Sequence, residues 1–248
     1  MLRTIVTILF VVIFLILSLP FLLIECLVKH ISPEAYDWSQ LRVVQWGLRV
    51  VAFLSGAKTT YIGLENIPTD EPVLFIGNHQ SIFDIVLTYG ILPNKTGFIS
   101  KDGMKKVPVI ATYMNRIHCL FLSRDNLKEG LKVITQAIAY VKEGVSMFIY
   151  PEGHRNKSGD PLKMDEFKDG SFKIAQRTGC KIIPVATLNT PAIFESHFPA
   201  IKKAKVVIEF GKPVSYAALT PEERKHVGSH FRGIVLEMLE NNLNKYYN

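Results

Sequence analysis

The stretch PVLFIGNHQSIFDIVLTYGIL, from Pro72 to Leu92, carries the pattern that indicates the fold. It begins with a short, continuously apolar run, which is typical of a strand buried on both faces of a sheet. The segment after Gly77 has the composition of a helix, and Pro93 ends it because proline cannot continue a helix. A buried strand followed at once by a helix is the repeating unit of α/β domains.

The same alternation continues through the rest of the chain. Apolar runs that predict strands are separated by runs with helical spacing, of which the longest extends from Asn126 to Gly144. A last helix is predicted from Thr220, whose side chain can cap it, with Pro221 at its first position. We therefore predict an α/β fold with a central, mostly parallel sheet flanked by helices.

The N-terminal segment is apolar enough to enter a membrane. No charged residue interrupts the run from Ile5 to Ile24, and a helix of this length rises about 30 Å, the thickness of a bilayer core. A signal peptide is the alternative, but its apolar part is usually shorter, and a small-residue cleavage pattern is missing from this run. We predict a retained membrane helix, which Pro20 can kink.

A second apolar stretch extends from Leu41 to Gly56. Its polar residues Arg42, Gln45 and Arg49 recur at spacings of three and four, so they share one face of a helix. The pattern fits a helix that lies in the membrane interface with its basic face toward the headgroups. It fits equally an amphipathic helix that packs on the main domain.

The two apolar segments together predict a membrane-associated helical hairpin over residues 1–57, followed by an α/β domain at 58–248. Such a hairpin can cross the bilayer or enter only one leaflet. Basic residues after the first helix outnumber those before it. By the positive-inside tendency, this asymmetry places the main domain in the cytoplasm.

Composition restricts the classes of partner. The formal net charge of +7 favours anionic partners, such as an acidic membrane surface or a phosphorylated substrate. Neither a long basic run nor zinc-finger spacing supports nucleic acid as a partner. The three cysteines, Cys26, Cys119 and Cys180, lie far apart in apolar runs, which is typical of unpaired thiols in a reducing compartment.

His79 and Asp84 lie where the chain leaves the predicted strand for the helix. A carboxylate at this spacing can reach the histidine ring, fix its tautomer and stabilise its charged form. The same spacing is equally compatible with a structural histidine beside an aspartate that favours a helix start. Because α/β sheets place ligand sites at the carboxyl ends of their strands, the position favours catalysis. No metal is predicted, since a third and a fourth ligand are missing at useful spacing.

Further charged residues follow other predicted strands. These residues are Lys101, Arg124, Glu152 and Arg155, with Gly153 between the last two. If the strands are parallel, the whole set lies with His79 on one rim of the sheet. Guanidinium groups bind phosphate through two parallel hydrogen bonds, and a glycine lets backbone N–H groups approach an anion. The rim therefore predicts a site for a phosphorylated ligand.

Five short motifs resemble, in order and spacing, the sequence blocks of the glycerolipid acyltransferase family. They are NHQSIFD, FLSR, YPEGHRN, FKDG and IIPV, between about Tyr61 and Phe210. Within this family the chain looks most like the bacterial 1-acyl-sn-glycerol-3-phosphate acyltransferases. It departs from the family pattern at Tyr150, where phenylalanine is usual, at His154, where threonine is common, and at His118, near a usual glycine.

The resemblance implies a membrane-bound enzyme of phospholipid synthesis. It would move a fatty acyl group from acyl-CoA or acyl-carrier protein to the 2-hydroxyl of lysophosphatidic acid, giving phosphatidic acid, with no further cofactor. The expected location is the bacterial inner membrane, with the catalytic domain on the cytoplasmic side. By the resemblance, His79 would be the general base and Asp84 its orienting group, while the charged rim would hold the glycerol phosphate.

The last motif has two interpretations. Ile183, Pro184 and Val185 would line acyl or acceptor contacts, although packing in the core explains these apolar residues equally well. Other functions also stay open at this point. They are an acyltransferase of the same superfamily with another lysophospholipid, glycerol 3-phosphate or a lipid A precursor as acceptor, a lipid-binding protein without activity, and a metallohydrolase.

Overall fold

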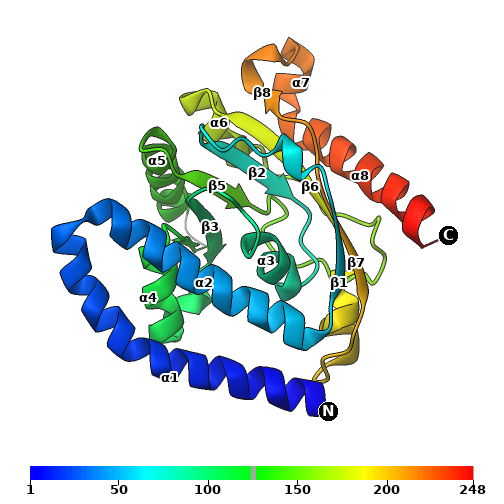
Figure 1. Cartoon of the computed structure of the whole chain (residues 1–248). Helices are drawn as coiled ribbons and strands as arrows, with labels where there is room; N and C mark the ends of the chain where they lie inside the picture. Colours follow the sequence, from blue (N-terminus) through cyan, green and yellow to red (C-terminus); the bar gives the residue numbers. More distant parts are fainter. Residues whose placement is uncertain (124–126, 248) are drawn as a thin grey trace.

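A single sheet forms the centre of the molecule (Figure 1). The computed structural model describes residues 1–123 and 127–247. The strands in this part of the chain are β1 Lys58–Ile62, β2 Val73–Gly77, β3 Thr96–Lys101, β4 Leu120–Leu122, β5 Ser146–Ile149, β6 Lys181–Leu188, β7 Lys205–Phe210 and β8 Val214–Ser215. The α-helices are α1 Leu2–Ile31, α2 Pro33–Ser55, α3 Ile82–Tyr89, α4 Pro108–Arg116, α5 Leu127–Lys142, α6 Lys173–Thr178, α7 Pro221–Lys225 and α8 Val227–Tyr246.

The strand order across the sheet is β1-β7-β6-β2-β5-β3-β4, with β8 beside β6. Strands β6, β2, β5, β3 and β4 are parallel, whereas β7 and β8 run antiparallel to β6, and β1 is parallel to β7. The predicted mostly parallel α/β sheet is therefore confirmed. Because β2 is central, the residues that follow it are flanked by the ends of β5 and β6.

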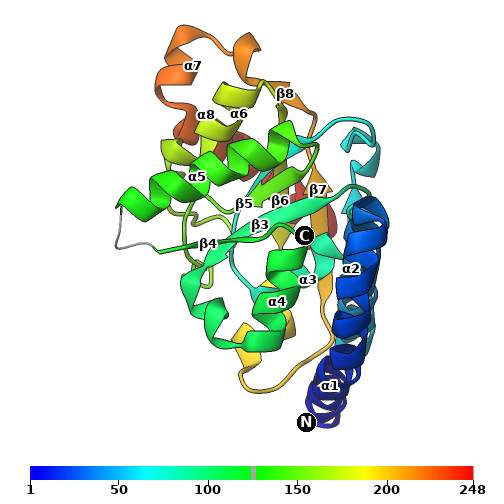
Figure 2. The same ribbon diagram turned by 90° about the vertical axis from the view of Figure 1, so that its left-hand side faces the viewer.

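Helices cover both faces of the sheet. On one face, α5, α6 and α8 contribute to a buried cluster that includes Ala137, Ile174 and Phe231. On the other face, α2 and α3 contribute Leu41 and Phe83 to a second buried cluster. Figure 2 shows α1 and α2 along the side of the sheet away from α5 and α6. The arrangement is a three-layer sandwich with the N-terminal helices added outside α3 and α4.

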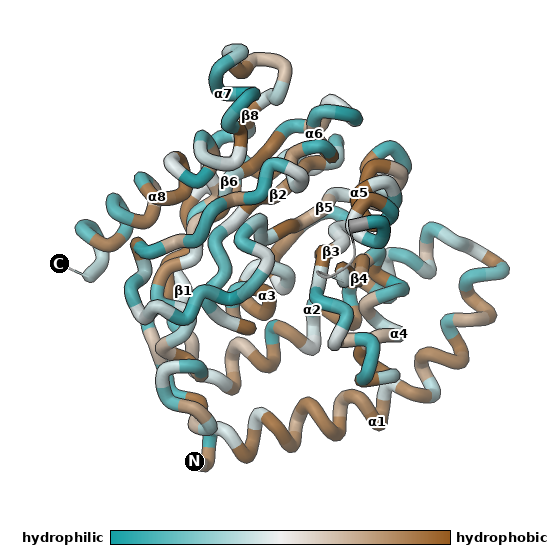
Figure 3. The backbone as a smooth tube through the Cα atoms, turned by 180° about the vertical axis from the view of Figure 1, so that it is seen from behind, coloured by the Kyte–Doolittle hydropathy of each residue, from teal (hydrophilic) through white to brown (hydrophobic). Residues whose placement is uncertain are grey.

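Helices α1 and α2 form the predicted hairpin, joined at Ser32, whose side chain accepts a hydrogen bond from Ala35 N–H. The polar face of α1 points inward: its buried residues include Thr4, Thr7, Ser18 and Glu25. Its apolar residues are exposed along its whole length. Figure 3 shows that hydrophobic residues make up most of this helix. Within the described residues, α1 is the helix long and apolar enough to cross a membrane. Exposed apolar surface of this extent marks a site of membrane or protein contact.

Helix α2 turns its polar face toward the main domain. Gln45 is buried and donates hydrogen bonds to the carbonyl oxygens of Tyr89 and Leu92, at the end of α3, at 3.2 and 2.7 Å. The neighbouring Arg42 side chain donates a hydrogen bond to the Gln45 side-chain oxygen, and the Arg49 side chain donates one to the Gln45 carbonyl oxygen. Of the two interpretations of this stretch, the structure agrees with packing on the domain.

Candidate active site

His79 lies two residues after the end of β2, and Asp84 lies in the first turn of α3. The structure places His79 Nδ1 2.9 Å from Asp84 Oδ2. The aspartate side chain is fully buried, whereas the histidine side chain is 15% exposed. A carboxylate on one ring nitrogen leaves the other nitrogen able to take a proton, and the exposed edge lets a ligand approach it.

Three more donors hold the Asp84 carboxylate in place. Oδ2 also accepts the backbone N–H groups of Gln80 at 2.7 Å and Ser81 at 2.8 Å. Oδ1 accepts the Thr190 hydroxyl at 2.5 Å. A buried charge is stable only when it is well paired, and these donors supply the pairing. Asp84 therefore caps the helix start and binds the histidine at once, so the two interpretations of the spacing are compatible.

Glu152 fixes the backbone of His79. Its Oε1 accepts the His79 N–H at 2.7 Å, and its Oε2 accepts the Asp165 N–H at 3.0 Å. The side chain is 1% exposed, and burial raises the pKa of its carboxyl while these hydrogen bonds lower it. Both oxygens are thus occupied inside the protein. The sequence predicts a substrate contact for Glu152, and what the structure shows is a positioning contact with the His79 backbone.

Tyr150 forms the floor under the histidine ring. The two rings are stacked with centroids 4.1 Å apart and an interplanar angle of 14°. Among the described residues, the Tyr150 hydroxyl is buried without a hydrogen-bond partner, and burial raises the pKa of this tyrosine well above its usual value. The ring holds the imidazole plane, which a phenylalanine would do equally well.

Arg155 is bound by a residue that the sequence patterns do not single out, Glu195. Glu195 Oε1 lies 3.0 Å from Arg155 Nη1 and accepts the Ile82 N–H at 2.9 Å, while Oε2 accepts the Ser81 hydroxyl at 2.6 Å. The arginine remains about half exposed. Its other N–H groups can therefore bind an anion beside the N-terminus of α3.

Gly153 is in the left-handed region, with φ +79°. Its own N–H donates to Tyr150 O at 2.9 Å, so any backbone contact with an anion at this turn would come from neighbouring N–H groups. A Cβ at this position would lie 3.1 Å from Lys168 Nζ. The left-handed backbone therefore favours glycine at this turn, and Lys168, an exposed cation of the FKDG motif, lies against it.

The remaining predicted site residues have different environments. Lys101 is exposed at the end of β3, which β5 separates from β2. Arg124 lies outside the described residues. Ile183 and Val185 are fully buried in the core beneath α3, and Pro184 is buried between them. The structure therefore agrees with core packing, the second interpretation of these three residues.

The two histidines that depart from the family pattern lie in different parts of the structure. His154 Nε2 lies 3.0 Å from Asp165 Oδ2 in the exposed loop after β5. His118 has φ +62°, and burial lowers the pKa of its imidazole. Its carbonyl oxygen lies 2.1 Å from the position that a Cβ of Gly97 would take, so the two backbone segments approach closely at this point.

Thr190 and Glu195 belong to one segment after β6, formed by the short 3-10 helices Thr190–Ile193 and Glu195–His197. Sequence reasoning missed both residues, because they lie more than 100 positions from the α3 residues that they contact. Only the pairing of β6 beside β2 brings this segment to the start of α3.

A buried carboxylate, a histidine oriented by it and a nearby cation at the carboxyl end of a parallel sheet are the arrangement expected of an α/β enzyme that uses acid–base chemistry. The chain belongs to the Acyltransferase family, whose model matches residues 58–188, more than half of its length.

Individual relatives agree with this assignment. The chain is 36% identical over 137 residues to a chloroplastic 1-acyl-sn-glycerol-3-phosphate acyltransferase of Brassica napus, a match of 55% of this chain but 39% of that protein. It is 27% identical over 193 residues to the 1-acyl-sn-glycerol-3-phosphate acyltransferase of Borreliella burgdorferi, 78% of this chain and 76% of the relative. The chain thus spans well under half of the plant relative's length and most of the bacterial relative's length.

A solved structure has the same fold. The crystal structure of the 1-acyl-sn-glycerophosphate acyltransferase of Thermotoga maritima matches with a TM-score of 0.80 at 21% identity, over 97% of this chain and 95% of that chain. The match includes the N-terminal helices as well as the sheet, because almost the whole chain is covered.

Proposed function

We propose that this chain transfers a fatty acyl group from an acyl thioester, either acyl-CoA or acyl-carrier protein, to the 2-hydroxyl of 1-acylglycerol 3-phosphate. The observation that carries the proposal is the geometry of His79, which is bonded to a buried carboxylate on one nitrogen and exposed at its edge. The names of the relatives support the same acceptor for this chain.

His79 would act as the general base. Its Nε2 takes the proton of the 2-hydroxyl as that oxygen attacks the thioester carbonyl carbon, while Nδ1–H stays bonded to Asp84. The tetrahedral intermediate collapses, the carbon–sulfur bond breaks, and His79 returns the proton to the leaving thiolate. The products are the ester and a free thiol, so the reaction needs no acyl-enzyme.

The cations near the pair would hold the acceptor phosphate. Arg155 is the first candidate, because it is half exposed beside the start of α3. Lys168 reaches over the Gly153 turn in the same loop region. Lys101, further along the sheet edge, is a weaker candidate, and Arg124 keeps the phosphate role that the family resemblance implies.

The N-terminal hairpin would keep the enzyme on its lipid substrate. The apolar surface of α1 fits the interior of a bilayer, and a net charge of +7 favours an anionic membrane. We place the enzyme in the bacterial inner membrane with the α/β domain on the cytoplasmic side, where acyl thioesters are made.

The test is thiol release by the purified full-length protein, with lysophosphatidic acid, glycerol 3-phosphate and lysophosphatidylcholine compared as acceptors. His79→Ala should lower turnover at least about 100-fold, the lower bound of what a general base contributes. His154→Ala is the matched control, because His154 lies in the neighbouring loop and pairs with an exposed aspartate. Near-normal turnover of His79→Ala would refute the mechanism, and a preference for another acceptor would reassign the substrate.

A further inference from the structure

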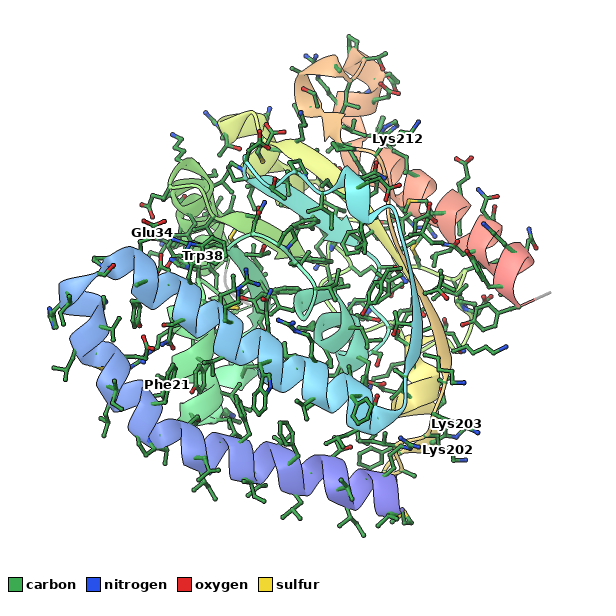
Figure 4. All side chains as sticks on the ribbon, in the orientation of Figure 1. Phe21, Glu34, Trp38, Lys202, Lys203 and Lys212 are labelled. Atoms are coloured by element: carbon green, nitrogen blue, oxygen red, sulfur yellow. The ribbon has the colours of Figure 1, made fainter. Side chains whose placement is uncertain are left out.

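A shallow depression of about 930 Å³ lies at the open end of the hairpin, where the start of α1 meets the end of α2. A loop of the main domain, Ile201–Lys203, forms its third side. Figure 4 shows Lys202 and Lys203 beside the N-terminal end of α1. None of the lining residues belongs to the candidate active site, so this is a separate feature of the surface.

Hydrogen bonds hold the three sides of the depression together. Ile201 N–H donates to the buried Thr4 hydroxyl at 2.8 Å, which fastens the loop to α1. Arg3 Nη1 donates to Leu54 O at 2.8 Å, which fastens the start of α1 to the end of α2. The depression is therefore part of the folded structure and not a gap between loose ends.

The lining combines exposed cations with exposed apolar side chains. Arg3, Lys202 and Lys203 are exposed, and no acidic residue is among the lining residues. In the described part of the chain, neither lysine takes part in an ion pair. Leu2 and Phe53 are 77% and 80% exposed beside these cations.

We propose that this depression binds an anionic phospholipid, with the two lysines and Arg3 around the phosphate and the acyl chains along Leu2 and Phe53. Basic side chains next to apolar surface match the two ends of a lipid. A soluble phosphate would leave the apolar side chains uncovered, and they are continuous with the apolar face of α1. The site would hold the open end of the hairpin at the level of the headgroups.

The test uses the full chain, immobilised in uncharged detergent micelles that contain trace labelled phosphatidylglycerol or phosphatidylcholine. Retained lipid per protein is measured for the wild type and for Lys202→Gln/Lys203→Gln. The control, Lys212→Gln/Lys225→Gln, loses the same charge at the opposite end of the molecule, where Lys212 lies (Figure 4) and where α7 carries Lys225 (Figure 1). We expect the wild type to retain phosphatidylglycerol in preference to phosphatidylcholine. An exposed ion pair contributes up to about 1 kcal/mol, which is about fivefold in binding, so the site variant should lose up to roughly 25-fold and the control almost nothing.

Two further measurements separate this site from the catalytic one. His79→Ala should retain phosphatidylglycerol like the wild type, whether or not the proposed acyl transfer is correct. Thermal unfolding of the site variant should match the wild type, because both lysine side chains are exposed. Unchanged retention by the site variant, equal losses in both double variants, or equal retention of the two lipids by the wild type would each overturn the proposal.

Discussion

Thr190→Val tests whether the segment after β6 is part of the catalytic machinery. Valine has nearly the same shape as threonine, so packing around the fully buried Thr190 is kept. What disappears is the hydroxyl that donates to Asp84 Oδ1 at 2.5 Å. The carboxylate keeps its donors on Oδ2 but loses the one that fixes its rotation.

The expected effect follows from the kind of bond removed. A hydrogen bond to a charged, buried group contributes about 1.5–3 kcal/mol. If Asp84 stabilises the imidazolium form of His79 in the transition state, this energy appears in turnover, where about 1.4 kcal/mol is tenfold. We expect kcat to fall about ten- to a hundredfold, with little change in KM for either substrate.

The assay is thiol release at saturating donor and acceptor, with Thr190→Ser as the matched control. Serine keeps the hydroxyl and should restore most of the turnover, which a purely structural role for the methyl group would not produce. Turnover of Thr190→Val within twofold of the wild type, in protein that unfolds at the wild-type temperature, would refute the reasoning.

Three further predictions concern Tyr150, Arg155 and His118. Tyr150→Phe removes a buried hydroxyl that has no hydrogen-bond partner among the described residues. The free energy of unfolding should therefore rise by about 1 kcal/mol and the unfolding temperature by about 2–4 °C, while turnover stays within twofold of the wild type. A lower unfolding temperature would mean that the hydroxyl is hydrogen-bonded. Arg155→Ala should raise KM for the phosphorylated acceptor about tenfold and leave KM for the thioester unchanged; equal effects on both would remove its phosphate role. Burial lowers the pKa of His118 in the folded state, so the unfolded chain binds more protons below about pH 6.5, and stability falls as the pH drops through that value. Asparagine tolerates a φ of +62°, so His118→Asn can be made without backbone strain. In denaturant titrations between about pH 6.5 and 5, the free energy of unfolding of this variant should fall less steeply with pH than that of the wild type. The same dependence on pH in both proteins would contradict a lowered pKa of His118.

Most of the order of strands and helices could be predicted because it depends on local patterns, although the first strand, β1, was not predicted. The run before Gly77 is apolar on both faces, and β2 has every residue buried. Two features had no local signal. The direction of β7, which runs antiparallel to β6, depends on a long connection, and the final helix is divided at His226 into α7 and α8. Periodicity predicts an element but not the direction in which it joins a sheet.

The candidate site could be predicted where its residues are close in sequence. His79 and Asp84 lie five positions apart where the strand leads into the helix, so their contact follows from the strand–helix geometry. Glu152 was found from its position at a strand end, but its role depends on which atoms are already bonded, and sequence gives no information on that. Thr190 and Glu195 could not be found, because the order of strands in the sheet decides their contact with α3.

Helix α3 lies between the N-terminal hairpin and the candidate active site. Its N-terminus carries Asp84 and is held by Glu195, while the backbone at its C-terminal end is held by Gln45 of α2. Leu41 of α2 also shares a buried cluster with Phe83 of α3. Residues 1–57 were predicted as a separate unit, yet the core beneath α3 needs α2 to close it. The hairpin therefore packs on the helix that carries Asp84. Under the proposed function, α1 would attach the protein to lipid, and the packing of α2 on α3 would hold the His79–Asp84 pair at a fixed place relative to the surface on which the acceptor lies.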